Sequence, residues 1–494
     1  MDFADSTAIG LACVLTLICI LSYKMSWKGS KYRTFPPGPR PLPLIGNLHI
    51  MNMKKPYLTL LELSKKYGPV FSIQMGMKKA VVLAGYETVK DALINHAEEF
   101  GERARIPIFQ KMDKGNGLIL SNGENWKVMR RFTITTLRDF GMGKSTIEDK
   151  VIEECSFLIE HFDSFKGQPF ENTMVMNASI ANIIVAILLG QRYDYQDPTF
   201  MRLLSLVNEN IRLLGSPMVS LYNVFPFIGF LPGSHKTILK NVEELLSFIR
   251  NTFVEHLGQL DANDKRSYID VFLAKQKEEM STPDTYFHNK NLLAVVRNLF
   301  SAGMETTSTT LRWGFLLMMK YPGVQKKVQE EIERVLGSAQ AKYEHRKTMP
   351  YTDAVIHEIQ RFSNILPMSL PHETASDVIF KGYFIPKGTL VTPLLASVLQ
   401  DERHFEKPKQ FYPEHFLDSE GRFLKKDAFM PFSAGRRVCA GETLARMELF
   451  VFFTSLLQKF NFCLAPGVTD LDLTPAEGFT TPPMPHMICA IARS

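Results

Sequence analysis

The sequence is poor in cysteine, and the six cysteines that it contains are scattered along the chain. They lie at positions 13, 19, 155, 439, 463 and 489, with no CxxC motif and no paired spacing. A small secreted disulfide framework is therefore excluded, and we expect mostly free thiols in a reducing compartment.

Linkers, repeats and low-complexity tracts are also missing from the interior of the chain. No glycine- or serine-rich stretch divides it, so one large domain accounts for most of its 494 residues. The composition, with 45% hydrophobic and 22% charged residues, excludes a disordered protein. The formal net charge is +6, but no stripe of basic and aromatic residues stands out, so nucleic-acid binding is not expected.

The chain has one long run without charge near its start, "STAIGLACVLTLICILSY", from Ser6 to Tyr23. Its length falls within the roughly 17–25 residues of a membrane-spanning helix. Basic residues follow the run, which predicts an anchor whose carboxyl end lies on the cytosolic side. A cleaved signal peptide is the alternative, but the residues before the run are acidic and no clean cleavage site follows it.

Proline dominates the next stretch, "FPPGPRPLPLIGN", from Phe35 to Asn47. Because proline fixes φ and removes a hydrogen-bond donor, the stretch is expected to be extended and stiff. Its position favours a spacer between anchor and domain over an SH3-type ligand.

Beyond residue 50 the pattern is mainly helical with a small β region, an α+β arrangement. "PYLTLLELSKKYG" begins with Pro56 and ends at Gly68, as a helix does, and "VFSIQMG" with "AVVLAG" predicts a hairpin. Long helices are expected from about 145 to 335, and strands and turns around 374 to 395.

An apolar stretch with three prolines, Ser216 to Gly233, lies between two helical segments. Ordinary core packing is one interpretation. The other is a second membrane contact, because a large exposed apolar loop is a liability unless it meets an apolar partner.

One cysteine has unusual surroundings, in "FSAGRRVCAG" (residues 432 to 441). Cys439 stands at or just before the start of an apolar helix, where backbone N–H groups favour a thiolate. Gly435 and Gly441 allow close approach of a flat object, and Arg437 can hold an anion beside the sulfur. Together these features suit haem.

Four motifs carry a resemblance to a known family. Phe432, Gly435, Arg437, Cys439 and Gly441 match F-x-x-G-x-R-x-C-x-G, which resembles the haem-thiolate loop of cytochrome P450. "AGMETT", Ala302 to Thr307, resembles the family's central-helix signature A-G-x-[DE]-T-[TS] and lies in a helix expected from Asn291 to Tyr321.

The other two motifs are "WKVMR", from Trp126 to Arg130, which resembles W-x-x-x-R, and "EIQR", from Glu358 to Arg361, which resembles E-x-x-R. The family closes the second with an arginine in a later P-E-R-F. Here "PEHF" has His415 at that position, which puts the geometry of this triad in question.

The resemblance spans roughly residues 35 to 494 and is greatest to the vertebrate microsomal enzymes of the second family. It implies a cytochrome P450 fold, mainly α with a small β region and an N-terminal membrane anchor helix. The expected segments are an anchor at 1–24, a basic and proline-rich linker at 25–47, and a haem-thiolate catalytic domain at 48–494.

The resemblance also implies the roles of individual residues. Cys439 would bind the iron of haem b, with Phe432 packed beside the sulfur and Gly441 leaving room for the ring. The propionate partners would be Arg103, Trp126, Arg130, His372 and Arg437. Thr306 and Glu305 would deliver protons to iron-bound dioxygen, and Gly303 would let a ligand approach the helix. Without the resemblance, the same stretch is explained by a surface glutamate and by β-branched residues whose side chains bond to the backbone and bend the helix.

The implied activity is a monooxygenase that inserts one oxygen atom of O2 into lipophilic substrates such as xenobiotics, polyunsaturated fatty acids and steroids. NADPH would supply electrons through NADPH–cytochrome P450 reductase, with cytochrome b5 as a second candidate partner. The implied location is the endoplasmic reticulum membrane, with the catalytic domain on the cytosolic side. Expected substrate-binding residues are mostly aliphatic: Ile106, Leu120, Leu214, Leu299, Ala302, Leu366, Met368 and Phe479.

Two hypotheses about particular residues accompany this reading. Arg105 and Arg212 are candidates to anchor a substrate carboxylate. A basic surface is expected to steer an acidic reductase, formed by Lys127, Arg131, Arg138, Lys144 and Arg436. Two other functions remain open, a haem-thiolate isomerase or dehydratase that uses a peroxide without reductase, and a membrane-anchored haem- or lipid-binding protein.

Overall fold

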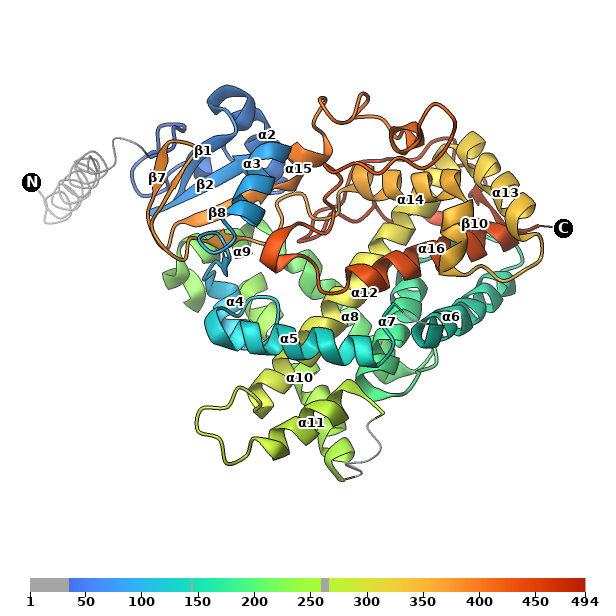
Figure 1. Cartoon of the computed structure of the whole chain (residues 1–494), viewed down its shortest axis with the longest axis horizontal. Helices are drawn as coiled ribbons and strands as arrows, with labels where there is room; N and C mark the ends of the chain where they lie inside the picture. Colours follow the sequence, from blue (N-terminus) through green and yellow to red (C-terminus); the bar gives the residue numbers. More distant parts are fainter. Residues whose placement is uncertain (1–34, 144, 259–265, 494) are drawn as a thin grey trace, which may run out of the picture.

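The computed structural model describes residues 35–143, 145–258 and 266–493 (Figure 1). The anchor predicted for residues 1–24 lies outside this part of the chain, as do residues 25–34 of the predicted linker. Among the helices within it, none is long and apolar enough to cross a membrane.

Helices make up most of the described chain, which confirms the mainly α prediction. The α-helices are α2 (Pro56–Tyr67), α3 (Tyr86–Lys90), α4 (Pro107–Asp113), α5 (Gly123–Asp139), α6 (Ser145–Ser164), α7 (Thr173–Leu189), α8 (Pro198–Leu214), α9 (Pro217–Val224), α10 (Ser234–Gly258), α11 (Tyr268–Glu278), α12 (Asn289–Lys320), α13 (Pro322–Leu336), α14 (Pro350–Ser363), α15 (Leu395–Leu399) and α16 (Glu442–Lys459). Shorter turns are η1 (Leu48–Ile50), η2 (Asp91–Asn95), η3 (Pro226–Phe230), η4 (Tyr343–Thr348), η5 (Pro413–Phe416) and η6 (Gly435–Arg437).

The strands form three small sheets. The largest has the order β1-β2-β8-β5-β3, with β1 (Val70–Met75), β2 (Lys78–Ala84), β3 (Glu102–Arg103), β5 (His372–Glu373) and β8 (Leu390–Leu394). The others are β4-β10-β9 and β6-β7, built from β4 (Phe170–Glu171), β6 (Val378–Phe380), β7 (Tyr383–Ile385), β9 (Phe460–Leu464) and β10 (Met487–Ala492). The larger sheet lies at one side of the molecule, away from α6 and α13 (Figure 1).

Local sequence signals explain several of these elements. Pro56 occupies the first turn of α2, and Gly68 follows the helix with φ 88°, as the sequence predicts. β1 and β2 form the predicted antiparallel hairpin, with Val70 opposite Leu83. Pro322 stands just after the end of α12, where a proline cannot continue the preceding helix.

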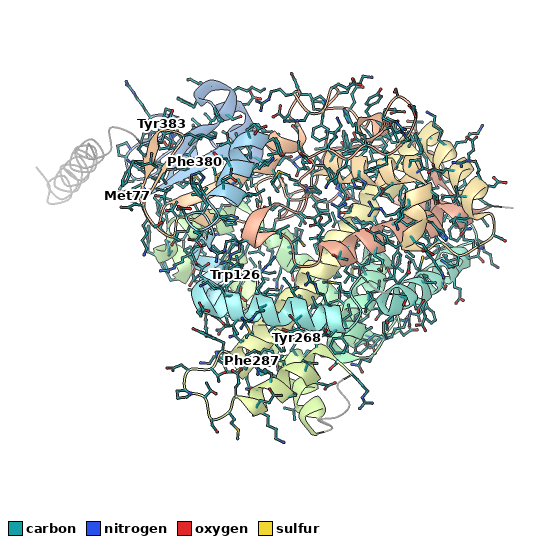
Figure 2. The ribbon with its side chains drawn as sticks, in the orientation of Figure 1. Met77, Trp126, Tyr268, Phe287, Phe380 and Tyr383 are labelled. Carbon is teal, nitrogen blue, oxygen red and sulfur yellow. The ribbon has the colours of Figure 1, made fainter. Side chains whose placement is uncertain are left out.

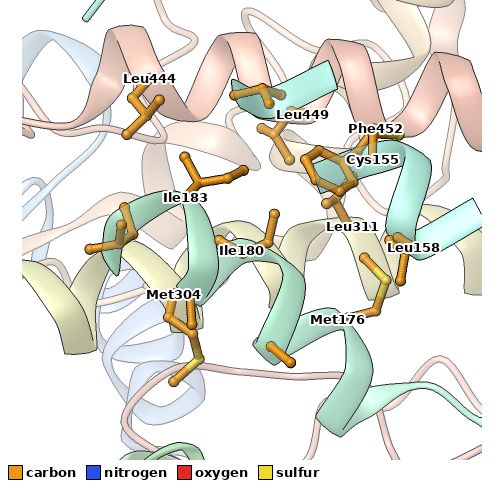
Figure 3. Close-up of a cluster of buried hydrophobic side chains, with 14 of the residues drawn as sticks. Cys155, Leu158, Met176, Ile180, Ile183, Met304, Leu311, Leu444, Leu449 and Phe452 are labelled. Atoms are coloured by element: carbon orange, nitrogen blue, oxygen red, sulfur yellow. The ribbon is translucent and has the colours of Figure 1, made fainter. Parts of the chain in front are cut away.

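The longest helix, α12, runs through the helical part of the molecule and organises its core. It packs against α7, α14 and α16, and α16 in turn packs against α6. Figure 3 shows this core, in which Ile180 and Ile183 of α7 lie between Met304 of α12 and the two leucines of α16, Leu444 and Leu449. Burial of this apolar surface fixes the helix that carries the "AGMETT" motif against the helix that follows Cys439.

The proline-rich stretch lies along the larger sheet. The backbone N–H of Ser72 in β1 donates to the carbonyl of Pro37 at 2.7 Å, and its hydroxyl donates to that of Pro36 at 2.7 Å. Asn47 is buried and its Oδ1 accepts the backbone N–H of Gln74 at 2.7 Å. The stretch therefore adds to the packed domain on the β1 edge.

The apolar stretch 216–233 forms α9 and η3, and its two halves differ. Val219 and Tyr222 of α9 are buried, whereas the rings of Phe227 and Phe230 in η3 are 74% and 75% exposed. Core packing thus accounts for α9, and η3 presents aromatic rings to the surroundings.

Candidate functional site

A cavity of about 390 Å³ lies between α12 and the loop that precedes α16. Cys439 lies on its wall, and so do Glu305 and Thr306 of α12. The predicted substrate-binding residues found on its wall are Leu120, Leu214, Leu299, Ala302, Leu366 and Phe479. The lining is predominantly apolar, with a small set of polar groups, as in ligand sites.

Two of the predicted substrate-binding residues do not line this cavity. Ile106 precedes α4 and packs, partly buried, in the apolar cluster that contains Ile108 and Val219. Met368 packs against the sheet cluster that contains Phe71 and Val82. Both side chains thus pack against neighbouring apolar residues, and a position in the sequence does not reveal which apolar partner a side chain contacts.

The loop before α16 holds Cys439 by its backbone. The Cys439 N–H donates to the carbonyl of Phe432 at 3.1 Å, and both residues line the cavity. Gly435 has φ 71°, and a Cβ there would lie 1.8 Å from the carbonyl oxygen of Leu93. The sequence prediction that Gly435 makes room for a flat ligand is therefore wrong, because the missing side chain makes room for η2. At Gly441 a Cβ would have only Cys439 Sγ nearby, at 4.0 Å, so that position is open.

Opposing influences act on the pKa of the Cys439 thiol. The side chain is open to the cavity, yet it sits deep within the protein, and this burial raises the pKa of its thiol. Hydrogen bonds from the backbone N–H groups of Gly441 and Glu442, and the nearby Arg130, act to lower that pKa. Burial outweighs the helix end here, and a cation bound at the sulfur would favour the thiolate.

Three buried or half-buried arginines converge beside the cysteine loop. Arg103, Arg130 and Arg437 all line the cavity. Burial, reinforced by the other guanidinium groups, lowers the pKa of Arg103 to about 9 and that of Arg437 to about 8. The Arg437 guanidinium lies 3.7 Å from the centroid of the Trp126 ring, and Trp126 lies on α5 (Figure 2).

Protein groups satisfy these arginines only in part. Arg130 donates to the carbonyl of Val438 at 2.7 Å, and Arg437 donates to Gly101 O at 2.8 Å and to Asn122 Oδ1 at 3.0 Å. Arg103 Nε, Arg437 Nη1 and Trp126 Nε1 are buried donors without a partner in the described chain.

His372 lies behind this group rather than on the cavity wall. Its Nδ1 donates to the carbonyl of Phe100 at 2.6 Å, and its Nε2 accepts from Arg103 Nη1 at 2.6 Å. Burial and the neighbouring Arg103 hold the pKa of His372 well below its ordinary value. The predicted direct contact of His372 with a propionate is thus corrected to a positioning contact with Arg103.

The donor set fits haem b. Three positive side chains line this wall, and the unpartnered N–H groups of Arg103, Arg437 and Trp126 suit the two anionic propionates. A thiol on the same wall is the soft ligand that haem iron takes in this type of site. Burying several like charges together is costly unless an anion joins them. The residues present therefore match the group that the motif predicts.

On α12 the acid and the hydroxyl are both in place but turned apart. Thr306 Oγ1 donates to the carbonyl of Ala302 at 2.8 Å, whereas Glu305 Oε1 accepts from Thr309 at 3.1 Å and from Thr480 at 3.0 Å. Burial raises the pKa of Glu305. The carboxyl is therefore suited to keep a proton.

Gly303 has a second role that the sequence did not predict. A Cβ at Gly303 would lie 2.7 Å from Cδ1 of Ile184, so this glycine allows α7 to approach α12 closely. Gly303 also lines the cavity, so the missing side chain serves both the close packing of α7 on α12 and the space at the cavity wall.

The E-x-x-R motif forms a closed triad with histidine. Arg361 donates two hydrogen bonds to Glu358, at 2.6 and 2.7 Å, and His415 Nδ1 lies 3.1 Å from Glu358 Oε2. All three side chains are buried. The departure from arginine at position 415 leaves the geometry of the triad intact.

Several polar groups on the cavity wall were not anticipated from the sequence. Glu448 of α16 accepts from Thr307 at 3.0 Å, and burial raises its pKa to about 8. Asp113 of α4 pairs with Arg297 of α12 on the same wall. A charged residue inside an otherwise apolar helical pattern was the available signal for Glu448 and Arg297.

The proposed carboxylate anchors are not part of this wall. Arg105 and Arg212 are exposed, and neither lines the cavity within the described chain. The expectation that they hold a substrate is therefore wrong.

Comparisons with known proteins agree with the geometry. The family model described as "Cytochrome P450" matches residues 36–490. Cytochrome P450 2K4 of Oncorhynchus mykiss is 53% identical over 493 residues, covering 99% of this chain and 98% of the relative. Cytochrome P450 2K6 of Danio rerio is 52% identical over 457 residues (92% and 90%), and cytochrome P450 2C11 of Rattus norvegicus is 47% identical over 485 residues (97% and 97%).

Proposed function

The chain belongs to the cytochrome P450 family, within its second family, as a haem b monooxygenase, and from this premise we propose that it oxidises lipophilic substrates with electrons from NADPH. The apolar cavity beside Cys439 is the observation that carries the proposal. When bound, haem supplies the activation of dioxygen and the transfer of one oxygen atom to the substrate.

The residues of the chain bind and orient the cofactor. Cys439 provides the thiolate ligand, and Arg103, Arg130 and Arg437 hold the propionates together with the Trp126 N–H. His372 acts one step removed, because it fixes the guanidinium of Arg103. Phe432 supports the loop through its carbonyl, which accepts from the Cys439 N–H.

Proton supply belongs to α12. Burial raises the pKa of Glu305 and so favours its protonated form, and the hydroxyl of Thr306 both donates and accepts. The two side chains can therefore pass protons from the protein interior to the cavity. The carboxyl must turn away from Thr309 and Thr480 to do so.

Substrate choice follows from the wall of the cavity. Leu120, Leu214, Leu299, Ala302, Leu366 and Phe479 give an apolar surface that excludes water and favours lipophilic molecules such as xenobiotics, fatty acids or steroids.

Electrons would come from NADPH–cytochrome P450 reductase, with cytochrome b5 as a second donor. Lys127, Arg131 and Arg138 on α5, together with Arg436, are exposed and give a basic face for an acidic partner. Lys144 lies outside the described residues.

The proposed location is the endoplasmic reticulum membrane, with the catalytic domain on the cytosolic side. The uncharged run in the sequence supports an anchor, and the exposed rings of Phe227 and Phe230 support a second contact with lipid.

The test begins with a carbon-monoxide difference spectrum of the reduced protein and of Cys439→Ala. A red-shifted thiolate-type Soret band in the wild type, lost in the variant, is expected; a folded, haem-supplemented wild type without that band contradicts ligation by Cys439. Turnover of a lipophilic substrate is then measured with and without NADPH and reductase, and product that forms without reductase contradicts the proposed electron source.

A further inference from the structure

A buried ion pair stands on the wall of this predominantly apolar cavity. Asp113, the last residue of α4, accepts a hydrogen bond from Nη2 of Arg297 on α12, and both side chains line the cavity. Their side chains are only 3% and 6% exposed. No part of the haem cradle or the proton supply described above uses this pair.

The pair is incompletely satisfied. One guanidinium nitrogen and one carboxylate oxygen form the contact, while Arg297 Nε and Asp113 Oδ2 are buried without a partner in the described chain. Asn298 adds only a long contact of 3.5 Å to Asp113. Paired charges buried in this way add little stability compared with apolar residues, so stability alone does not explain them.

The region around the pair is already held by neutral groups. Asn298 Oδ1 accepts the backbone N–H groups of Leu118 and Ile119 at 3.0 and 3.1 Å, and Asn291 Oδ1 accepts that of Gly117 at 3.0 Å. The segment between α4 and α5 is therefore fastened to α12 without the ion pair.

We propose that Asp113 and Arg297 form the docking point for the carboxylate of a lipophilic acid, with Arg297 binding the acid and Asp113 releasing it. This inference rests on the proposed function and names the substrate class of the same cavity. Arg297 replaces the exposed Arg105 and Arg212 as the anchor, because of these three arginines Arg297 is the one that lines the cavity.

The two charges are not equally easy to neutralise. Arginine stays protonated, whereas burial already raises the pKa of Asp113. When an acid binds, its proton can pass to Asp113, and Arg297 then pairs with the substrate carboxylate, so the net charge of the site is unchanged. A cationic amine would leave two cations against one carboxylate, which a buried site disfavours.

The spacing suits an acid with a long hydrocarbon chain. Arg297 precedes Thr306 by nine residues of α12, which corresponds to about 13 Å along the helix axis. An extended chain covers about 1.2 Å per bond, so roughly eleven bonds are the minimum for this axial rise, because nine residues also leave the two side chains about half a turn apart around the helix. Dodecanoic acid is therefore the shortest suitable probe.

The test measures binding of three probes to the holoenzyme by equilibrium dialysis: dodecanoic acid, methyl dodecanoate and dodecylamine. In the wild type the acid should bind roughly tenfold more tightly than the ester, and the ester roughly tenfold more tightly than the amine. Each interval corresponds to a charged hydrogen bond. This comparison needs no variant and no turnover.

Two variants then distinguish the proposed docking point from an ion pair that only stabilises the fold. Asp113→Asn keeps an acceptor oxygen but leaves Arg297 its full charge, so acid affinity should rise several-fold. In the double variant D113N with R297Q, acid affinity should fall roughly tenfold while ester affinity stays within about twofold. Arg105→Gln and Arg212→Gln are matched controls that should change neither.

The outcomes are distinct. Equal affinity for acid and ester in the wild type, or variants that change both affinities alike, overturns the docking point and leaves the monooxygenase proposal standing. Binding of none of the three probes overturns the docking point and also the lipophilic substrate class.

Discussion

His415 donates through Nδ1 to Oε2 of Glu358 at 3.1 Å, while its Nε2 accepts the backbone N–H of Lys407 at 3.2 Å. Because that N–H can only donate, the ring must carry its proton on Nδ1. A histidine thus completes the triad by holding Glu358 from one side and residue 407 from the other.

This arrangement predicts that His415→Ala destabilises the fold by about 2–4 kcal/mol, since it removes a hydrogen bond to a buried carboxylate and leaves a cavity. Denaturant unfolding of the wild type and the variant measures the difference. His49→Ala, at an exposed histidine, is the control and should change the free energy of unfolding by less than about 0.5 kcal/mol. Equal effects of the two substitutions would contradict a role for His415 in the triad.

Glu448 is expected to make stability depend on pH. Its pKa is raised from 4.5 to about 8 by burial, so between these values the folded protein holds a proton that the unfolded chain has lost. Stability should therefore fall as pH rises from about 4.5 to 8, and Glu448→Gln should remove that fall, a difference of up to about 4 kcal/mol. Unfolding free energies measured across this range test it.

The control for this pH series is Glu406→Gln, because the Glu406 side chain is 66% exposed and its substitution should leave the slope unchanged. Parallel pH profiles for the wild type and Glu448→Gln would show that Glu448 titrates alike in both states, contrary to the prediction.

The exposed rings of η3 predict insertion into lipid. In the full chain reconstituted in phospholipid vesicles, Phe230→Trp should place an indole where brominated acyl chains quench its fluorescence, relative to the wild-type background. Met280→Trp is a matched control, because Met280 is 80% exposed, compared with 75% for Phe230, and lies between α11 and α12. Similar quenching at both positions would argue against a specific contact through η3.

Thr306 is expected to matter for product formation rather than for binding. Thr306→Val keeps the shape but removes the hydroxyl, so product formation should fall roughly 100-fold while substrate affinity changes little. Thr306→Ser, which keeps the hydroxyl, should retain most of the activity. The measurement is product formed per NADPH consumed, and a wild-type ratio in the valine variant would exclude Thr306 from proton delivery.

Much of the fold could be predicted because its signals are local. Pro56 and Gly68 delimit α2, alternating residues define the β1–β2 hairpin, and the spacing around Cys439 identified the cofactor and the family before any contact was known. Each of these signals lies within a short segment, and the physical constraint it expresses acts within that segment.

The candidate site was predicted less completely. Gly435 and Gly303 were singled out, but the contacts that require a glycine there, with Leu93 and Ile184, were not predicted; Gly303 also lines the cavity. His372 was assigned to the right neighbourhood but contacts Arg103. In each case the residue type was informative and its partner was not.

The sequence by itself determined the haem-thiolate loop, the central helix with its acid and hydroxyl, and a mainly helical domain, because these depend on residues close together in the chain. Only the tertiary structure decided which side chains share the cavity. Asp113 and Arg297 are 184 residues apart, and Glu358 and His415 are 57 apart. Such pairs form only when burial of apolar surface brings distant elements together, and no local pattern encodes which polar groups then meet.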